Sequence, residues 1–333
     1  MSPASAPRAF VLGNFVLACC WHVGRQPMAG ETLEADHFHA EAGGKGLNVA
    51  IGLRRLGADV QTLIGCGQDR AADALLALLA AEGLPTDHVH RLPGASGWGS
   101  GLIGADGHNS IAVYLGANRL LTAEHAHAAR NAIGASQLVY GQFETSLAAV
   151  QAAFAIAHAH GVPTVLNPSP WHTPPQALAD TTHTLIVNAV EAAALLNLPG
   201  DPGPTAAQAA HTVAARLPAL GSAWPALRRL VVTLGAEGAL GMERAAHAEP
   251  WRAWHAAAPR IQAVDTVGAG DAFASGYCTA VLAGQPLPVA LAWGNLCGAH
   301  VAAQRGVLDG LPDAAWLQQA RSGVADDAVS LSI

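Results

Sequence analysis

The stretch DTVGAGDAF, Asp265–Phe273, places a run of very small residues directly before a carboxylate, at the start of an apolar, helix-like segment. Small residues let a backbone approach a ligand closely, and the first N–H groups of a helix point outward at the positive end of its dipole. Gly268, Ala269 and Gly270 are therefore a candidate anion cradle, with Asp271 beside it. Such a cradle stabilises the charge that develops in phosphoryl transfer, and the carboxylate can take a proton from an attacking hydroxyl. A tight helix start capped by Asp271 is the alternative.

A second glycine-rich stretch, GGKGLNVA at Gly43–Ala50, also precedes a helix-like segment. It is not a P-loop, because the glycine spacing differs and no Ser or Thr follows the lysine. Its glycines again permit close approach, and the Asn48 side chain offers both donors and acceptors, which suits sugar hydroxyls. A glycine-rich helix entry without a ligand is the alternative.

Composition and charge exclude several classes of protein. The 333 residues have a net charge of -7 and no basic block, so we expect no nucleic-acid partner. No run of about 18 apolar residues occurs, so we expect no membrane span. The five cysteines lack metal-ligand spacing, which favours reduced thiols and a cytoplasmic location.

The rest of the chain alternates strand-like and helix-like segments. Strands separated by helices of this length indicate right-handed βαβ units, hence an α/β fold with a doubly wound, mainly parallel sheet flanked by helices. We predict strands at 9–18, 60–67, 136–144 and 162–170, strands that begin 184–198 and 227–240, and helices at 47–58, 71–84, 146–161, 271–284 and 288–306.

Two segments depart from this alternation of strands and helices, approximately residues 28–42 and 97–116. Both alternate polar and apolar residues between glycine turns, which predicts exposed antiparallel strands. We expect a single domain over residues 1–333, in which these segments form a small β lid on the larger sheet.

Together, the two glycine-rich motifs resemble the paired signatures of the ribokinase-like (PfkB) carbohydrate kinase family. The signatures here are GGKGLNVAIGLRRLGADVQTLIGCGQD at 43–69 and DTVGAGDAFASGY at 265–277, in the family's order. The resemblance covers residues 9 to about 320 and is closest in pattern to the ribokinase subfamily. Further agreeing segments are PMAGE (27–31), GAN (116–118), QFE (142–144), NPSP (167–170), NAVE (188–191) and TLGAEG (233–238).

This resemblance implies an ATP- and Mg²⁺-dependent kinase that phosphorylates a hydroxymethyl group of a sugar or sugar-like molecule. It also implies a lid over the sugar, shared between the two subunits of a homodimer. Asp271 matches the catalytic base, and Gly268, Ala269 and Gly270 match the anion hole. Gly44, Lys45, Asn48 and Glu144 match sugar contacts; Asn188 and Glu191 match the phosphate and water-mediated Mg²⁺ motif; Thr233, Gly235 and Gly238 match the nucleotide loop; and Asn295 falls where the adenine is flanked.

A monovalent-cation site is implied as well, mostly through carbonyl oxygens. A serine usual at the edge of this site is Gly310 here, which leaves activation by K⁺ open. The residues that fall at the site are Asp265, Val267, Val301, Gln304 and Gly306.

The first strand departs from the family pattern. In ribokinases this strand has the pattern GSxNxD, and its Asn and Asp bind sugar hydroxyls. The corresponding sequence here is GNFVLA at 13–18, with Val16 and Ala18 at those two positions. A site that loses its hydroxyl partners loses that recognition. Either the acceptor is not a plain ribose or other residues hold it; Cys19, Cys20 and Trp21 would form a larger wall, suited to a base, an aromatic aglycone or a deoxy sugar.

Two alternatives remain beside a sugar kinase. A nucleoside kinase is favoured by the apolar first strand, although GAN, QFE and NPSP are ribokinase-like. A non-catalytic ligand-binding relative is disfavoured by Asp271, Asn188 and Glu191, because binding alone needs no base.

Overall fold

The protein, a computed structural model, is described over residues 6–105, 109–203, 205–247, 249–322 and 329–331. Its larger sheet is mainly parallel within these ranges: every pairing from β5 to β11 is parallel, and those from β11 to β14 are antiparallel. The expected doubly wound sheet is thereby confirmed. In sheet order the strands are β14 (Val329–Leu331), β13 (Arg252–Ala256), β12 (Ala239–Glu243), β11 (Arg229–Thr233), β10 (Thr184–Asn188), β9 (Thr164–Asn167), β8 (Leu138–Gln142), β1 (Arg8–Leu12), β4 (Asp59–Cys66) and β5 (Val89–Arg91).

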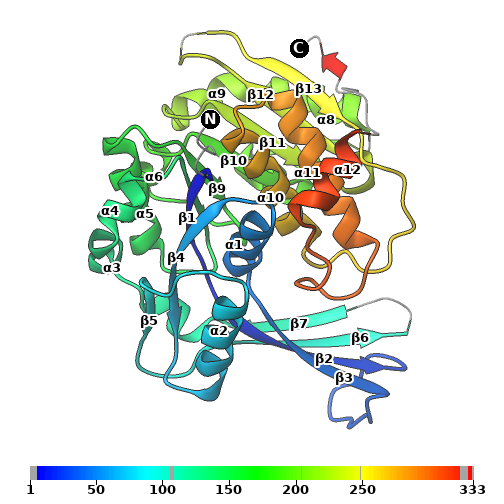
Figure 1. Cartoon of the computed structure of the whole chain (residues 1–333). Coiled ribbons are helices and arrows are strands. Elements are labelled where there is room, and N and C mark those ends of the chain that lie inside the picture. The colour runs from blue at the N-terminus through cyan, green and yellow to red at the C-terminus, as the bar shows by residue number, and fades with distance from the viewer. Residues whose placement is uncertain (1–5, 106–108, 204, 248, 323–328, 332–333) are drawn as a thin grey trace.

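Helices cover both faces of this sheet (Figure 1). In β1, Val11 packs into the core on one face, while Phe10 and Leu12 pack into the core on the other. Among the described residues, no helix is both long and apolar enough to cross a bilayer. The first face carries α1 (Lys45–Arg55), α2 (Arg70–Ala81), α10 (Ala269–Leu282), α11 (Leu287–Ala302) and α12 (Ala314–Ser322); the second carries α3 (Ala123–Ala128), α4 (Arg130–Gly134), α5 (Leu147–Ala159), α6 (Gln176–Ala179), α7 (Ala189–Leu195), α8 (Ala206–Ala214) and α9 (Leu217–Ala223); η1 (Gly116–Leu120) and η2 (Gly235–Glu237) are short 3-10 turns.

A smaller sheet projects from one end of the molecule and forms the expected lid (Figure 1). Its order is β3 (His37–Gly43), β2 (Val16–Val23), β6 (Gly97–Gly104), β7 (Asn109–Tyr114). The outer pairings, β3–β2 and β6–β7, are antiparallel, whereas β2 and β6 run parallel. Of the predicted lid segments, residues 28–36 form no strand, and residues 106–108 lie outside the described residues.

The single strand predicted over residues 9–18 is wrong. β1 ends at Leu12 in the large sheet, and β2 begins at Val16 in the lid. A Cβ on Gly13 would lie 2.6 Å from Ile64 Cγ1, so only glycine fits this crossing point. Asn14, next in the chain, is buried and accepts a hydrogen bond from the Gly46 N–H at 2.8 Å. Apolar periodicity could not reveal the break, because both strands are apolar.

Candidate active site

The predicted site residues gather at the carboxyl ends of the parallel strands. The strand order reverses between β1 and β8, because β4 and β5 lie on one side of β1 while β8 to β11 lie on the other. Open α/β sheets bind ligands at such reversal points. Here Asn14, just after β1, donates from Nδ2 to Glu144 Oε2, just after β8, at 3.0 Å.

Asn14 holds this end of the site together. Its Oδ1 accepts from the Gly46 N–H at 2.8 Å and from Gln142 Nε2 at 3.1 Å. The side chain thus joins the start of α1, the end of β8 and the Glu144 carboxylate. Sequence reasoning missed Asn14 and Gln142, although a polar residue two positions after the apolar run Ala9–Leu12 was a usable signal.

Asp271 and Asn48 form the buried pair at the centre of the site. Asp271 lies in the first turn of α10 and is only 8% exposed. Asn48, on α1, donates from Nδ2 to Asp271 Oδ2 at 2.7 Å. Its other amide atom, Oδ1, is buried and has no hydrogen-bond partner in the described part of the chain. A buried polar atom is normally satisfied, so a free acceptor beside a carboxylate is suited to a ligand hydroxyl.

Lys45 is the one lysine in the sequence, and it couples electrostatically to three carboxylates, those of Asp271, Glu144 and Glu191. Burial raises the pKa of Asp271, and the positive charge of Lys45 and the hydrogen bond from Asn48 partly oppose that shift. The pKa of Lys45 is in turn raised, mainly by Asp271. Burial also raises the pKa of Glu144, which Lys45 again opposes. The lysine therefore stabilises the charged form of a base held in a dry environment.

The start of α10 is open to a ligand. Gly268 precedes the helix with a left-handed φ of 77°, and a Cβ there would lie 2.3 Å from Val307 Cγ1. A Cβ on Gly270 would have no atom within 4 Å, so the backbone of this turn faces open space. Because the first N–H groups of a helix lack partners inside it, the Gly268–Gly270 turn can accept an anion beside Asp271.

Asn188 and Glu191 lie at the end of β10 and in the first turn of α7. The Asn188 N–H donates to Glu191 Oε2 at 3.0 Å, and the Glu191 N–H donates to Asn188 Oδ1 at 2.8 Å. This reciprocal capping box fixes both side chains and uses only one oxygen of each. Asn188 Nδ2 and Glu191 Oε1 make no hydrogen bond within the described residues, so they fit a phosphate oxygen and a metal-bound water.

The remaining predicted nucleotide residues come from three segments that meet. Thr233 ends β11, and Gly235 opens the short turn that follows. Gly238 has a φ of 90°, and a Cβ there would lie 2.1 Å from the Ala256 carbonyl oxygen. Asn295, on α11, donates from Nδ2 to the same carbonyl at 2.8 Å. The Asn295 side chain therefore positions the backbone after β13 next to the loop that contains Gly238.

The two segments of the predicted cation site lie against each other. The N–H groups of Val264 and Asp265 both donate to the Ala302 carbonyl, at 2.8 and 3.3 Å. A Cβ built on Gly310 would lie 3.1 Å from the Gly306 carbonyl oxygen and 3.6 Å from that of Val307, so position 310 adjoins these two carbonyls. The other predicted members, Val267, Val301 and Gln304, lie on these same segments.

The inner face of the lid is apolar where the family has its hydroxyl-binding pair. Val16 is 8% exposed and pairs with Gly43 and Gly97. Ala18 pairs with Glu41 across β2 and β3, so the two side chains lie on the same face. The half-buried Glu41 carboxylate would lie 3.5 Å from a Cβ on Gly306, and burial raises its pKa. Sequence reasoning missed Glu41, because only the strand register reveals that it faces the site.

A buried carboxylate beside an open, small-residue helix start is suited to the transfer of a phosphoryl group to a hydroxyl. The particular family follows from comparison: residues 11–314 match the model described as pfkB family carbohydrate kinase, and the chain belongs to that family. It is 31% identical over 265 residues to a deoxyribokinase of Salmonella typhi, covering 79% of this chain and 82% of the relative. It is 30% identical over 293 residues to a ribokinase of Schizosaccharomyces pombe, covering 86% and 89%. An Arabidopsis thaliana ribokinase structure, complexed with ribose and ATP, superposes with a TM-score of 0.82 at 24% identity, covering 94% and 98%. The chain is therefore a sugar kinase, as its two motifs predicted.

Proposed function

We propose that this kinase transfers the γ-phosphoryl group of ATP to the hydroxymethyl group of a pentose-like sugar that lacks a hydroxyl where Val16 and Ala18 point. A 2-deoxypentose is the leading acceptor. The observation that carries the reaction type is the buried Asn48–Asp271 pair at the open start of α10. The observation that carries the acceptor is the apolar face of β2, and the deoxyribokinase relative supports it.

In this proposal each half of the reaction has its own residues. Asp271 takes the proton of the hydroxymethyl group while that oxygen bonds to phosphorus and ADP leaves. The Gly268–Gly270 turn stabilises the charge on the transferring group. Asn48 Oδ1, free and buried, accepts from a sugar hydroxyl. Gly44 lets the backbone approach the sugar, and Lys45 and Glu144 complete its contacts.

The nucleotide is assigned to the neighbouring strand ends. ATP supplies the phosphoryl group, and Mg²⁺ neutralises charge on its phosphates. Asn188 Nδ2 is free for a phosphate oxygen, and Glu191 Oε1 for a water of the metal. Thr233, Gly235 and Gly238 border the nucleotide, and Asn295 holds the backbone beside the adenine. We assign a monovalent-cation role to the segments that contain Asp265, Val267, Val301, Gln304 and Gly306, weakened by Gly310.

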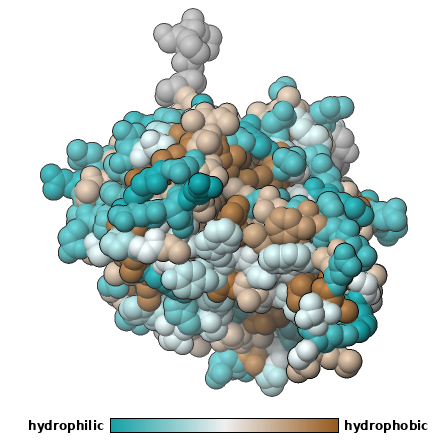
Figure 2. All heavy atoms as spheres, turned by 90° about the horizontal axis from the view of Figure 1, so that it is seen from below, coloured by the Kyte–Doolittle hydropathy of each residue, from teal (hydrophilic) through white to brown (hydrophobic). Residues whose placement is uncertain are grey.

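A second copy of the chain is the partner we propose for the outer face of the lid. Phe38, Trp98 and Tyr114 lie on that face, and are 50%, 41% and 61% exposed. Seen from below, brown and near-white surface spans the middle of this side, with hydrophilic side chains around it (Figure 2). Apolar patches of this kind mark association surfaces. Light scattering should show a dimer that Trp98→Glu dissociates and Leu120→Glu, on η1, leaves intact; a monomeric wild type would contradict the proposal.

The remaining proposals concern the whole chain. We propose that residues 1–333 act as one kinase domain with the lid inside it, and that the protein works in the cytoplasm. Free thiols support the location: Cys19, Cys20, Cys66, Cys278 and Cys297 form no disulfide within the described residues.

An acceptor screen tests the proposed function. ATP consumption is measured with Mg²⁺ and 2-deoxy-D-ribose, D-ribose, other pentoses, hexoses and nucleosides, with the Asp271→Asn variant as the blank. Turnover of 2-deoxy-D-ribose well above D-ribose is expected. A nucleoside as the best acceptor would establish the alternative that the apolar β2 face also favours, and D-ribose as the best would overturn the acceptor assignment.

A further inference from the structure

A carboxylate of the lid contacts the loop that follows α11. This carboxylate belongs to Glu41, which lies on β3 in register with Ala18 and is half-buried. Its Oε2 would lie 3.5 Å from a Cβ on Gly306. The backbone N–H of Val307 is its hydrogen-bond partner. Glu41 therefore joins the lid to the segment between α11 and α12.

The surroundings of Glu41 allow it to accept this hydrogen bond in either protonation state. Burial raises the pKa of its carboxyl, and Asp309 and Asp265 add to that rise, while the charge of His39 and the N–H of Val307 oppose it. The ionised carboxylate forms the stronger hydrogen bond. A protonated carboxyl still keeps an acceptor oxygen, so the contact with Val307 does not depend on the charge.

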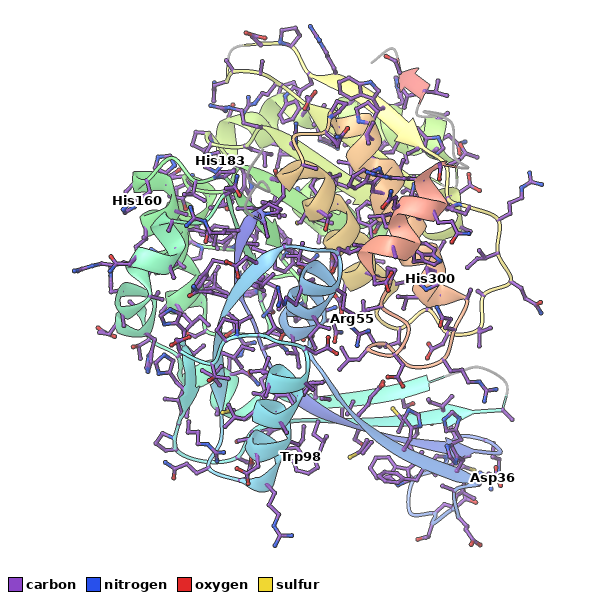
Figure 3. The ribbon with its side chains drawn as sticks, viewed as in Figure 1. Asp36, Arg55, Trp98, His160, His183 and His300 are labelled. Carbon is purple, nitrogen blue, oxygen red and sulfur yellow. The ribbon has the colours of Figure 1, made fainter. Side chains whose placement is uncertain are left out.

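The middle of this loop has few other hydrogen bonds. Within the described residues, the segment 305–307 makes no hydrogen bond between backbone groups. The flank after it is fixed, because Arg55 on α1 donates to the carbonyls of Leu308 and Leu311. Arg55 lies between the helices and the lid in the view of Figure 3. Glu41 thus supplies a hydrogen bond where the loop backbone forms none of its own.

The side chain of Val307 reaches the start of α10. Val307 is buried, and its Cγ1 and Cγ2 would lie 2.3 and 2.8 Å from a Cβ on Gly268. Its methyl groups therefore lie against the backbone of Gly268, which begins the turn that is open to a ligand at Gly270. Because closely packed groups transmit small displacements, the position of Val307 bears on the position of this turn.

We propose that Glu41 is a positioning residue for phosphoryl transfer, because it holds Val307 against Gly268 and so fixes the anion cradle at the start of α10. This inference rests on the proposed function, in which the Gly268–Gly270 turn stabilises the transferring group. Glu41 acts on that turn through Val307 and does not touch the group itself. Hydrogen-bond donors stabilise developing charge best when they are fixed in place beforehand. The lid then influences the rate as well as the binding of the acceptor.

Two variants of similar size test the hydrogen bond. Glu41→Met removes the acceptor and should lower kcat by about tenfold with every accepted sugar, the scale of one lost hydrogen bond. The KM of the acceptor should change little. Glu41→Gln keeps an oxygen that accepts from the Val307 N–H, so its kcat should stay close to wild type. Steady-state kinetics with saturating ATP and Mg²⁺ measure both, and a residue that only stabilised the fold would not divide its effect in this way.

A double-mutant cycle tests the route through Val307. Val307→Ala should also lower kcat, because it removes the methyl groups that lie against Gly268. Glu41→Met should then have a much smaller effect on kcat in the Val307→Ala background than in wild type. Residues that act through one shared contact are not additive, whereas independent ones are.

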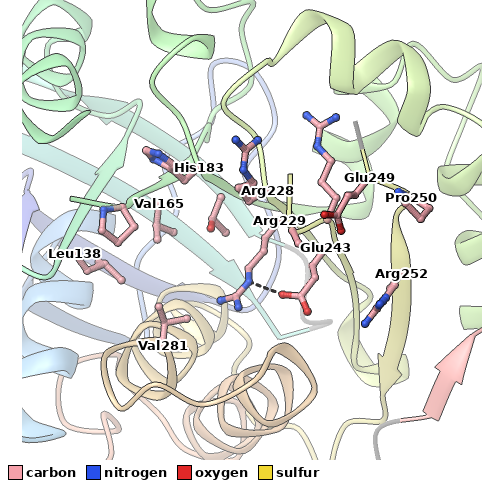
Figure 4. Close-up of a pocket in the computed structure, with 14 residues that line it drawn as sticks. Leu138, Val165, His183, Arg228, Arg229, Glu243, Glu249, Pro250, Arg252 and Val281 are labelled. Carbon is pink, nitrogen blue, oxygen red and sulfur yellow. Dashed lines mark hydrogen bonds and ion pairs between the residues drawn. The ribbon is translucent and has the colours of Figure 1, made fainter. Parts of the chain in front are cut away.

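Glu243→Met is the matched control. Glu243 is also a half-buried carboxylate on a strand, in register between Arg229 and Arg252. It accepts a hydrogen bond from Arg229 Nε at 2.9 Å (Figure 4). This pair lies at the first residue of β11, whereas the candidate site lies at the other ends of the parallel strands. Glu243→Met should therefore leave kcat and KM unchanged, at an assay temperature at which melting curves show every variant to be folded.

Several results would overturn this inference. Wild-type kcat in Glu41→Met would do so and leave the kinase assignment intact. A raised acceptor KM at unchanged kcat would show that Glu41 binds the sugar itself. Equal losses in Glu41→Gln and Glu41→Met, or additive effects with Val307→Ala, would exclude the hydrogen bond to Val307 as the cause. A wild-type protein that phosphorylates no sugar or nucleoside would overturn the proposed function and this inference with it. If Glu41→Met is not folded, Glu41→Ala takes its place with the same expected results.

Discussion

In the proposed function the start of α10 and the start of β2 face the same acceptor, yet only the first keeps the residues of its family. At α10, Gly268, Gly270 and Asp271 form an open turn with a buried base, and Asn48 holds that base. At β2, Val16 and Ala18 present apolar side chains where the family grips sugar hydroxyls. Under the proposed function, phosphoryl transfer and acceptor choice therefore lie on separate segments. Substitutions at α10 should therefore change the rate with every acceptor, and substitutions at β2 should change which acceptor is preferred.

The largest effect is expected at the base. Asp271→Asn should lower kcat by about a hundredfold to ten-thousandfold, the usual cost of losing a general base. Nucleotide affinity and melting temperature should stay close to wild type, because the amide keeps the shape of the carboxylate. Steady-state kinetics with the best acceptor measure the loss, and Asp87→Asn, on the exposed surface, is the matched control. Retention of more than a tenth of the wild-type rate would show that another group takes the proton.

The second test restores hydroxyl-binding side chains to β2. Val16→Asn/Ala18→Asp should raise kcat/KM for D-ribose by about tenfold to a hundredfold, because each restored hydrogen bond contributes about 0.5–1.5 kcal/mol. The gain for 2-deoxy-D-ribose should be smaller, because that acceptor leaves a new buried group unpaired. Leu120→Asn, at an exposed position on η1, is the control. The wild-type enzyme could instead have equal kcat/KM for D-ribose and 2-deoxy-D-ribose. That result would mean that Asn48 and Glu144 suffice to bind the sugar hydroxyls.

A third test concerns the charge that keeps the base ionised. Lys45 lowers the pKa of Asp271 against the effect of burial. Lys45→Met should therefore raise that pKa further, so the acidic limb of the kcat–pH profile should move to higher pH. The loss of rate should be several-fold greater near pH 6 than near pH 8, since a protonated carboxyl cannot accept the proton. Lys45→Arg keeps the charge and should shift the limb much less. If the acidic limb does not move in Lys45→Met, Lys45 does not set the pKa of Asp271.

The sequence could predict the α10 region and could not predict the β2 region, for a physical reason. Glycine runs before Asp271 and Asn48 have local consequences, and α1 and α10 begin within a few residues of their predicted starts. The break at Gly13 depends on a contact with Ile64, 51 positions further along the chain. Glu41 faces the site only through its register with Ala18. The row formed by Arg229, Glu243 and Arg252 is similarly invisible, because it depends on the register of β11, β12 and β13.

The smallest effect is expected at the edge of the predicted cation site, which adjoins both regions compared here. Gly310 does not have a positive φ, so serine fits its backbone. A Cβ there would lie 3.1 Å from the Gly306 carbonyl oxygen, which brings a serine hydroxyl to the Gly306 and Val307 carbonyls after a small shift. Gly310→Ser should therefore increase the stimulation of turnover by K⁺ by about twofold to fivefold, the scale of one added neutral contact.

Gly310→Ala adds the same Cβ without the hydroxyl and should leave the response to K⁺ at the wild-type level. Initial rates with KCl, against equal ionic strength from an organic cation chloride, measure the difference. If serine and alanine behave alike, the hydroxyl does not reach a bound cation and the site is not where these segments meet. If serine alone responds, the anion hole at Gly268, against which Val307 of the same loop packs, is sensitive to the cation. The effect should then be equal for all acceptors, because it belongs to the phosphoryl-transfer region and not to β2.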